Sequence, residues 1–255
     1  MHRRFAKSPH PWAMLAAGAL LGGCSAAGVR AAPAADVTAE RPLTAAFLVV
    51  DGVYGTELTA PYDVLEHTRH HAADGRGIEV FTVSPDGAEI VSAEGLRIRP
   101  DHSFATAPPI DILVVPSAEG SRDALLDDAA LVDWVRETGA RARYVVSLCW
   151  GAFVLAEAGL LDGYACTTFP GDYERFARAF PEPDLRFNVS FVHDRGRLTS
   201  QGGARSYEVA MYLVDLLLGA DVAAGVGRGL LIPWPPPPAD RPAMVSDAAP
   251  RPPAR

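Results

Sequence analysis

Short apolar runs alternate with helical patterns along the central part of the chain. In Thr44–Val50 and again in Asp111–Pro116, apolar residues follow one another directly, which is typical of buried strands. Between such runs apolar residues recur at helical spacing, as Leu58, Tyr62 and Leu65 do on one face of a predicted helix. The predicted strands are Thr44–Val50, Ile78–Ser84, Asp111–Pro116, Tyr144–Leu148 and Tyr164–Thr168, and the predicted helices lie near Leu58–His71, Asp128–Ala142, Gly151–Gly159, Gly171–Phe180 and Ser206–Leu218.

Two further segments predict β-hairpins. Ala88–Ser103 has Glu94 and Gly95 near its turn, and Phe187–Gln201 is the second such segment. The repeated alternation of strand and helix predicts a mainly parallel sheet with helices on both faces, an α/β three-layer sandwich. Sheets of this kind carry their sites at the carboxyl ends of the strands.

The N-terminal segment has the pattern of an export signal. Arg3, Arg4 and Lys7 precede a short apolar stretch, and residues 1–23 are therefore interpreted as a signal peptide. The stretch ends in Leu21–Cys24, which resembles a bacterial lipobox, so Cys24 is a candidate lipidation site; the alternative is a secretory signal with an incidental cysteine. By the same resemblance, the chain is expected on the periplasmic face of the cell envelope, lipid-anchored in the outer membrane.

The flanks of the predicted domain differ from it in composition. Residues 24–43 are rich in Ala, Pro and small polar residues and are interpreted as a flexible tether, and the proline-rich residues 234–255 as a disordered tail. The folded domain is then expected at residues 44–233. In the 255-residue chain this leaves material for one substantial core, and no segment inside the domain has the ~18 apolar residues of a membrane span.

The charge of the chain excludes one class of partner. Its formal net charge is −8 at pH 7, and an acidic surface repels phosphate backbones, so direct nucleic-acid binding is not expected.

Cys149 stands where a strand turns into a helix. It follows the predicted strand Tyr144–Leu148 directly and precedes the helix that begins near Gly151. Backbone N–H groups at the start of a helix have no helical partner and favour an anion, so a thiolate would be stabilised there, with Gly151 allowing close packing. This is the geometry of an exposed nucleophile. A buried structural cysteine at a strand end is the alternative.

The segment "SLCWGAFVLAEAGLLDG" resembles the nucleophile elbow of the ThiJ/PfpI superfamily, which has a flavodoxin-like, class I glutamine amidotransferase-like fold. The resemblance is nearest to isonitrile hydratases and to the amidotransferase-like domain of AraC-type regulators. It continues in "FLVVDGVYGTELTAPYDVLE", in "SAEGLRIRPDHSFATAPPIDILVVPSAEG" and in "GRLTSQGGARSYEVAMYLVDLLLG". The resemblance implies a small-molecule substrate or ligand, no cofactor or metal, and pairing into a homodimer.

The resemblance also assigns roles to residues near Cys149. Members of the family pair the elbow cysteine with an acidic residue of the first loop, and the matching position here is Glu57. Because a carboxylate beside a thiolate is unfavourable, one of the two should hold a proton, and a protonated Glu57 could donate it. Without the resemblance, Glu57 is an ordinary acidic residue at a helix N-terminus. Candidate substrate or oxyanion-binding groups are Trp150, Gly151 and the backbone N–H groups of Ala118 and Glu119.

Two departures from the family pattern bear on the activity. The relatives often carry a histidine after "TT", where this chain has Phe169, and they commonly have threonine where it has Trp150. We find no obvious substitute histidine; His67 and His71 close the first helix, where they offset the helix dipole or, alternatively, form a metal pair. Without a Cys–His pair, glutamine hydrolysis and peptide cleavage by the usual route are not expected.

Two functional hypotheses, a third that the motifs support less and one covalent alternative remain open; the third is the deglycase or glyoxalase activity of more distant relatives of the family. The first hypothesis is an isonitrile hydratase-like enzyme in which Cys149 attacks carbon and Glu57 supplies the proton, with Trp150 and Tyr54 as an apolar wall. The second is a non-catalytic lipoprotein that binds a ligand or senses oxidant through Cys149. A disulfide between Cys149 and Cys166 is conceivable in an oxidising compartment, but a free Cys149 is favoured.

Overall fold

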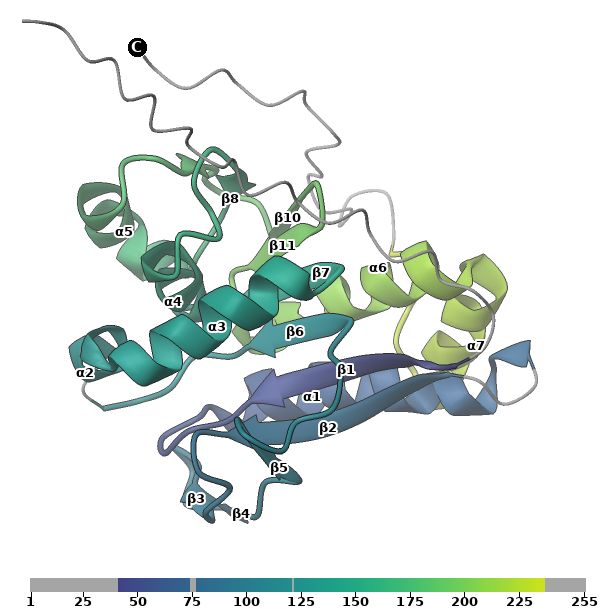
Figure 1. The fold of residues 1–255 in the computed structure, drawn as a ribbon. Helices are drawn as coiled ribbons and strands as arrows, with labels where there is room; N and C mark the ends of the chain where they lie inside the picture. Colours follow the sequence, from purple (N-terminus) through teal and green to yellow (C-terminus); the bar gives the residue numbers. More distant parts are fainter. Residues whose placement is uncertain (1–40, 74–76, 121, 237–255) are drawn as a thin grey trace, which may run out of the picture. The chain divides into compact units, whose positions relative to one another are not determined.

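The computed structural model describes residues 41–73, 77–120 and 122–236 (Figure 1). Their central feature is a seven-stranded sheet in the order β10-β11-β7-β6-β1-β2-β5, in which only the β10–β11 pair is antiparallel. The sheet strands are β1 (Leu43–Leu48), β2 (Ile78–Ser84), β5 (His102–Ser103), β6 (Ile112–Val115), β7 (Tyr144–Leu148), β10 (Phe191–Asp194) and β11 (Arg197–Ser200). The predicted mainly parallel α/β sheet is confirmed.

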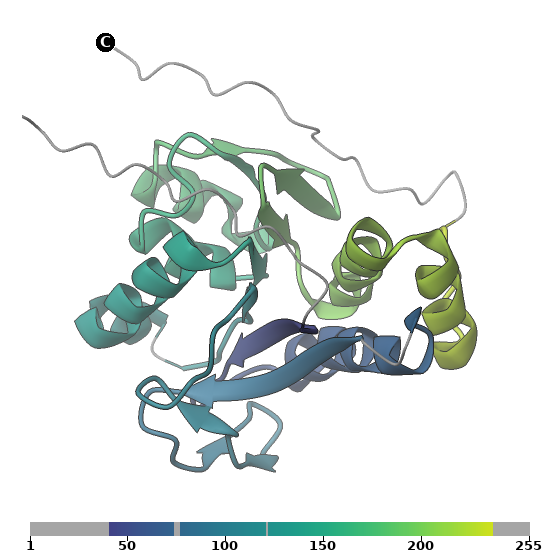
Figure 2. The ribbon, with the colours of Figure 1, turned by 45° about the vertical axis from the view of Figure 1, so that its right-hand side comes forward.

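Helices cover both faces of this sheet, as Figure 2 shows. On one face α1 packs against α6, and α6 against α7; on the other, α3 packs against α4, which contacts β6 and β7. The helices are α1 (Gly55–His67), α2 (Arg122–Asp127), α3 (Ala129–Arg141), α4 (Gly151–Glu157), α5 (Tyr173–Ala179), α6 (Ser206–Leu218) and α7 (Ala220–Leu230). The expected three layers are therefore present.

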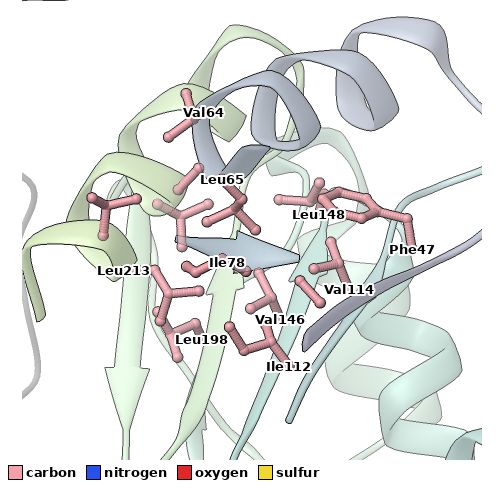
Figure 3. Close-up of a cluster of buried hydrophobic side chains, with 14 of the residues drawn as sticks. Phe47, Val64, Leu65, Ile78, Ile112, Val114, Val146, Leu148, Leu198 and Leu213 are labelled. Carbon is pink, nitrogen blue, oxygen red and sulfur yellow. The ribbon is translucent and has the colours of Figure 1, made fainter. Parts of the chain in front are cut away.

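The central strands supply side chains to both faces, which explains their continuous apolar sequences. In β6, Ile112 and Val114 point into the core beneath α1 and α6, whereas Leu113 and Val115 pack under α3 and α4. Figure 3 shows the first of these cores, where Leu65 of α1 and the strand side chains gather.

Both predicted hairpins are confirmed. β3 (Ile90–Val91) pairs with β4 (Arg97–Ile98), and β10 pairs with β11. Of the predicted strand Tyr164–Thr168, Ala165–Cys166 form the short strand β8, which lies in a separate two-stranded sheet. Its partner β9 (Asp184–Leu185) was not predicted.

Three helical features differ from the sequence-based expectation. α1 begins at Gly55, earlier than the predicted Leu58, and α2 and α7 were not predicted at all. The segment of α7, "ADVAAGVGRGL", has three glycines, which lower its helix propensity. Close packing explains why glycine occupies these positions of α7. A Cβ at Gly225 would come within 2.7 Å of the His71 ring, and one at Gly229 within 2.2 Å of His67 Nε2.

The predicted signal peptide (residues 1–23), Cys24 and most of the predicted tether and tail lie outside the described residues. The ends that are described make specific contacts. Arg41, in the predicted tether, forms a bidentate ion pair with Asp111, and Trp234, in the predicted tail, donates from Nε1 to Asp215 at 3.0 Å. Within the described part of the chain, no helix has the length and apolarity needed to cross a bilayer.

Candidate active site around Cys149

Cys149 occupies a sharp turn between β7 and α4. Its φ angle is +52°, a left-handed conformation that non-glycine residues rarely adopt and that costs about 1–3 kcal/mol. Two hydrogen bonds hold the turn in place: the Cys149 N–H donates to Ser200 O at 2.9 Å, and Thr168 Oγ1 donates to Cys149 O at 2.9 Å. The strand end and the two neighbouring segments therefore fix the sulfur-bearing residue in a strained, defined position.

Glycines on two sides allow this turn to pack closely. A Cβ added to Gly151 would lie 2.0 Å from Val115 O, so the first residue of α4 approaches the end of β6 in a way only glycine permits. Gly202 has φ +82°, and a Cβ there would lie 2.4 Å from both Cys149 Cβ and Glu57 Oε1. The backbone after β11 is thus the wall behind the cysteine and the glutamate.

Glu57 is placed beside the cysteine by the first turn of α1. Its side chain is buried, with 4% of its surface exposed, and three groups donate hydrogen bonds to it. Ser117 donates to Oε2 from its backbone N at 2.9 Å and from Oγ at 2.6 Å, and Gly203 N donates to Oε1 at 3.0 Å. Three donors on two oxygens would satisfy an ionised carboxylate, so the geometry favours a buried negative charge beside Cys149.

The sulfur of Cys149 is a thiol under ordinary conditions. Burial, and next the negative charge of Glu57, raise the pKa of the Cys149 thiol to about 12, although hydrogen bonds from Ser117 and the Trp150 backbone oppose this. The residue is 9% exposed. The expectation of a resting thiolate at the helix N-terminus was therefore wrong, because desolvation and the neighbouring carboxylate outweigh the helix donors. Burial and the adjacent Glu57 carboxyl group therefore both favour the protonated form of the Cys149 sulfur.

In the segment after β6, the residue that contacts the site is not one of the predicted backbone donors, Ala118 and Glu119. The expected donor Glu119 uses its N–H on Gly52 O at 2.7 Å, and Ala118, which is buried, forms an isolated antiparallel bridge with Val53. These contacts join the segment to the loop before α1, so the Glu119 N–H is not free for a substrate. Ser117, which the sequence pattern did not single out, is the residue of this segment that contributes to the site, by donating to Glu57. The position of Ser117 in the sequence could have indicated a site residue. It lies just after β6, the strand next to β7, at the carboxyl end of the sheet.

Trp150 does not form a wall of the site. Its side chain is fully buried and stacks on Phe153 with ring centroids 4.9 Å apart, and Phe153 in turn packs edge-on against Phe176. Its backbone N–H is the part that reaches the sulfur. Phe169, at the position of the missing histidine, is 46% exposed and directly follows Thr168, which contacts the Cys149 carbonyl.

The second cysteine of the domain is separate from this site. Cys149 and Cys166 are both free thiols, so the structure contains no disulfide between them. Cys166 lies in β8 with no exposed surface, and burial raises its pKa to about 12. It is a packed apolar residue. Among the described residues, the rings of His67 and His71 lie tilted with centroids 5.4 Å apart, but no group of three or more candidate ligands could hold a metal ion.

Comparison with protein families and sequences identifies relatives across most of the chain. The family model described as DJ-1/PfpI matches residues 43–216. The chain is 32% identical over 179 residues to isonitrile hydratase from Pseudomonas putida, a match that covers 69% of this chain and 73% of that protein. It is 26% identical over 198 residues to the transcriptional regulator GbdR from Pseudomonas aeruginosa, covering 77% of this chain and 53% of the regulator. The chain thus spans about half the length of that regulator.

Comparison with solved structures also finds proteins of the ThiJ/PfpI and DJ-1 kind. A ThiJ/PfpI family protein from Pseudomonas syringae superposes with a TM-score of 0.65 at 25% identity, covering 77% of both chains. DJ-1beta from Drosophila melanogaster superposes with a TM-score of 0.66 at 22% identity, covering 76% of this chain and all of that one. The second likeness shows a shared fold.

Proposed function

The chain belongs to the DJ-1/PfpI family, and from this premise we propose that it hydrates small isonitriles to N-substituted formamides through Cys149 and Glu57. The observation that carries the proposal is the buried pair itself, a thiol against a carboxyl group that accepts hydrogen bonds from Ser117 and Gly203. The relative from Pseudomonas putida, an isonitrile hydratase, supports the same chemistry.

The pair suits a substrate whose carbon must receive both a nucleophile and a proton. As the Cys149 sulfur attacks the terminal carbon, Glu57 takes the thiol proton and delivers it to that carbon, which gives a thioimidate, R–N=CH–S–Cys. Water then adds across the C=N bond, its oxygen to carbon and one proton to nitrogen, which gives R–NH–CH(OH)–S–Cys. The C–S bond breaks as the C=O bond forms, and the hydroxyl proton returns to the sulfur. The sum is R–NC plus water to R–NH–CHO, and both the thiol and the carboxylate are regenerated.

The electrostatics of the site favour a neutral substrate over the alternatives. An incoming anion would meet the charge of Glu57, whereas an isonitrile is uncharged and its linear end reaches a sulfur of which little is exposed. Amide hydrolysis needs an acid for the leaving amine, a task that histidine performs in the usual cysteine hydrolases. Phe169, half-exposed at the histidine position, supports an apolar substituent on the substrate.

The test is product formation by the purified protein. Wild type incubated with an alkyl isonitrile should release the formamide, detected by proton NMR, while Cys149→Ala and Glu57→Gln should fall to the uncatalysed rate. Cys166→Ala is the matched control, since that thiol lies in a separate strand, and it should keep wild-type turnover. No formamide from the wild type, or equal rates from wild type and Cys149→Ala, would reject the proposal.

An oxidant-sensing or ligand-binding role is the second candidate, and the thiol pKa weighs against the sensing form. Thiolates react with peroxide and thiols react slowly, so a thiol pKa of about 12 predicts slow oxidation of Cys149. Intact-mass analysis after mild peroxide treatment separates the two candidates. Rapid gain of two oxygens on the Cys149 peptide would favour the sensor.

We also propose a lipid anchor at Cys24, on the periplasmic face of the outer membrane. Its support is the sequence pattern of residues 1–24, a basic start followed by an apolar stretch that ends in a cysteine. Metabolic labelling with a palmitate analogue should mark the wild-type chain in the outer-membrane fraction and leave Cys24→Ser unlabelled. Equal labelling of both would reject the anchor.

A further inference from the structure

The β3–β4 hairpin clamps the loop that leads into α1. Two backbone hydrogen bonds join them: Gly52 N donates to Val91 O at 2.7 Å, and Ala93 N donates to Val53 O at 3.0 Å. A third contact comes from a side chain, because Val91 N donates to Asp51 Oδ1 at 2.8 Å. The hairpin therefore touches the loop on the stretch that directly precedes the helix of Glu57.

Glu94, at the tip of this hairpin, caps α1 from outside the helix. Its two carboxylate oxygens accept the Gly55 N–H at 3.1 and 3.0 Å, and Ser92 Oγ donates to Oε2 at 2.8 Å. Tyr54, the residue before the helix, provides no side-chain cap of its own. The hydrogen bond from Ser92 is the largest cause that lowers the pKa of Glu94, so the cap is a carboxylate at neutral pH. A negative charge is also favourable at a helix N-terminus.

The capped turn is the one that carries Glu57. Gly55 and Glu57 both lie in the first turn of α1, and Glu57 N donates to Tyr54 O at 3.1 Å. From the same turn, the side chain of Glu57 reaches back to Ser117 and the sulfur site. We propose that Glu94 is a positioning residue, which fixes the first turn of α1 so that the Glu57 carboxylate stays against the Cys149 sulfur. The inference rests on the Cys149–Glu57 pair of the proposed function, but it does not require an isonitrile.

Glutamine is a weaker cap than glutamate at position 94. Both oxygens of the carboxylate face donors, the Gly55 N–H and the Ser92 hydroxyl. An amide of the same size presents an NH2 group to one of them, so at least one acceptor is lost and a donor meets a donor. Glu94→Gln thus removes the negative charge and one acceptor of the cap with the smallest change of shape.

The readout is the rate at which iodoacetamide alkylates Cys149, localised by peptide mapping so that Cys24 and Cys166 do not contribute. When Glu57 moves away from the sulfur, its charge no longer disfavours the thiolate, so Glu94→Gln should speed alkylation by about tenfold at fixed pH. The matched control is Glu89→Gln, on the same hairpin, whose carboxylate pairs with exposed Arg97. The control should stay within about twofold of wild type, as is usual for an exposed ion pair.

A double-mutant cycle separates positioning from general loosening. In a Glu57→Gln background the carboxylate is gone, so adding Glu94→Gln should change the alkylation rate by less than about twofold. Equal acceleration in both backgrounds, or no acceleration in a Glu94→Gln protein with wild-type circular dichroism, overturns the proposal. If Glu94→Gln does not fold, Ser92→Ala takes its place, because it removes one donor to Glu94; it should accelerate alkylation less, and no acceleration overturns the proposal. Since no substrate is used, loss of the hydratase proposal would leave this result intact.

Discussion

The substitution Gly202→Ala tests the packing behind the site most sharply. The added Cβ would lie 2.4 Å from Cys149 Cβ, 2.4 Å from Glu57 Oε1 and 2.8 Å from Cys149 N. The two Cys149 atoms belong to the fixed elbow, and Glu57 Oε1, although it ends a side chain, is held by the Gly203 N–H. Real Cβ atoms do not approach so closely, so the loop, the elbow or the glutamate must move.

Two separate costs set the expected magnitude. The backbone at Gly202 has φ +82° and ψ −162°, a region nearly restricted to glycine, and holding an alanine there costs about 1–3 kcal/mol. Overpacking a buried contact costs about 1–3 kcal/mol more. Gly202→Ala should therefore lower the free energy of unfolding by about 4 kcal/mol in total.

Gly203→Ala is the matched control on the next residue. Its φ of +54° is left-handed, but a Cβ there meets nothing within 4 Å, and its N–H still donates to Glu57. The expected loss is only the left-handed strain, about 1–2 kcal/mol. Urea unfolding followed by circular dichroism measures both variants. A Gly202→Ala protein that is no less stable than Gly203→Ala would refute this account of the packing.

Three further predictions follow from individual contacts. Ser117→Ala removes the hydroxyl that donates to Glu57 at 2.6 Å and should lower the free energy of unfolding by about 1–3 kcal/mol, measured in urea. Because that hydroxyl also lowers the pKa of the Cys149 thiol, the variant should be alkylated more slowly at Cys149. A faster rate would contradict this role of Ser117. The Cys149 pKa is raised from 9.0 to about 12 in the folded protein, so this thiol favours folding fully below pH 9, and its contribution is lost as the pH rises toward 12. Cys149→Ala should show a weaker loss of stability over that range than wild type, and identical pH profiles would count against the shift. Asp128→Ala removes the cap that accepts from Leu131 N at 3.1 Å and should cost about 1 kcal/mol, measured by thermal unfolding.

Much of the fold could be predicted because local pattern and tertiary structure agree. The strand Tyr144–Leu148 and the helix Ser206–Leu218 have the predicted bounds, since their apolar residues face buried surfaces with the expected periods. α7 could not be predicted, because its glycines disfavour a helix locally. These glycines are compatible with a helix only because the ends of α1 and α7 meet, as the close approach of Gly229 to His67 shows.

The sequence could predict that Cys149 and Glu57 meet at the site, but it could not predict the protonation state of the thiol. The elbow position of Cys149 follows from one strand-to-helix boundary, and the pairing with Glu57 was inferred from the family resemblance. Burial depends on segments far apart in the sequence, above all Gly202 and Ser117, so the pattern around Cys149 could not indicate a thiol that holds its proton. For the same reason Trp150, which follows the cysteine, was an ambiguous residue until its stacking on Phe153 placed it in the core.

The central claim is that the Cys149 sulfur and the Glu57 carboxylate form one coupled pair, with the proton on sulfur. The most direct measurement is the pH dependence of Cys149 alkylation in wild type and in Glu57→Gln, with the modified peptide quantified by mass spectrometry. The account predicts that the wild-type rate still rises above pH 10, in keeping with a thiol pKa of about 12, and that the Glu57→Gln profile levels off at clearly lower pH. A wild-type profile that levels off near pH 9, or two superimposable profiles, would contradict it.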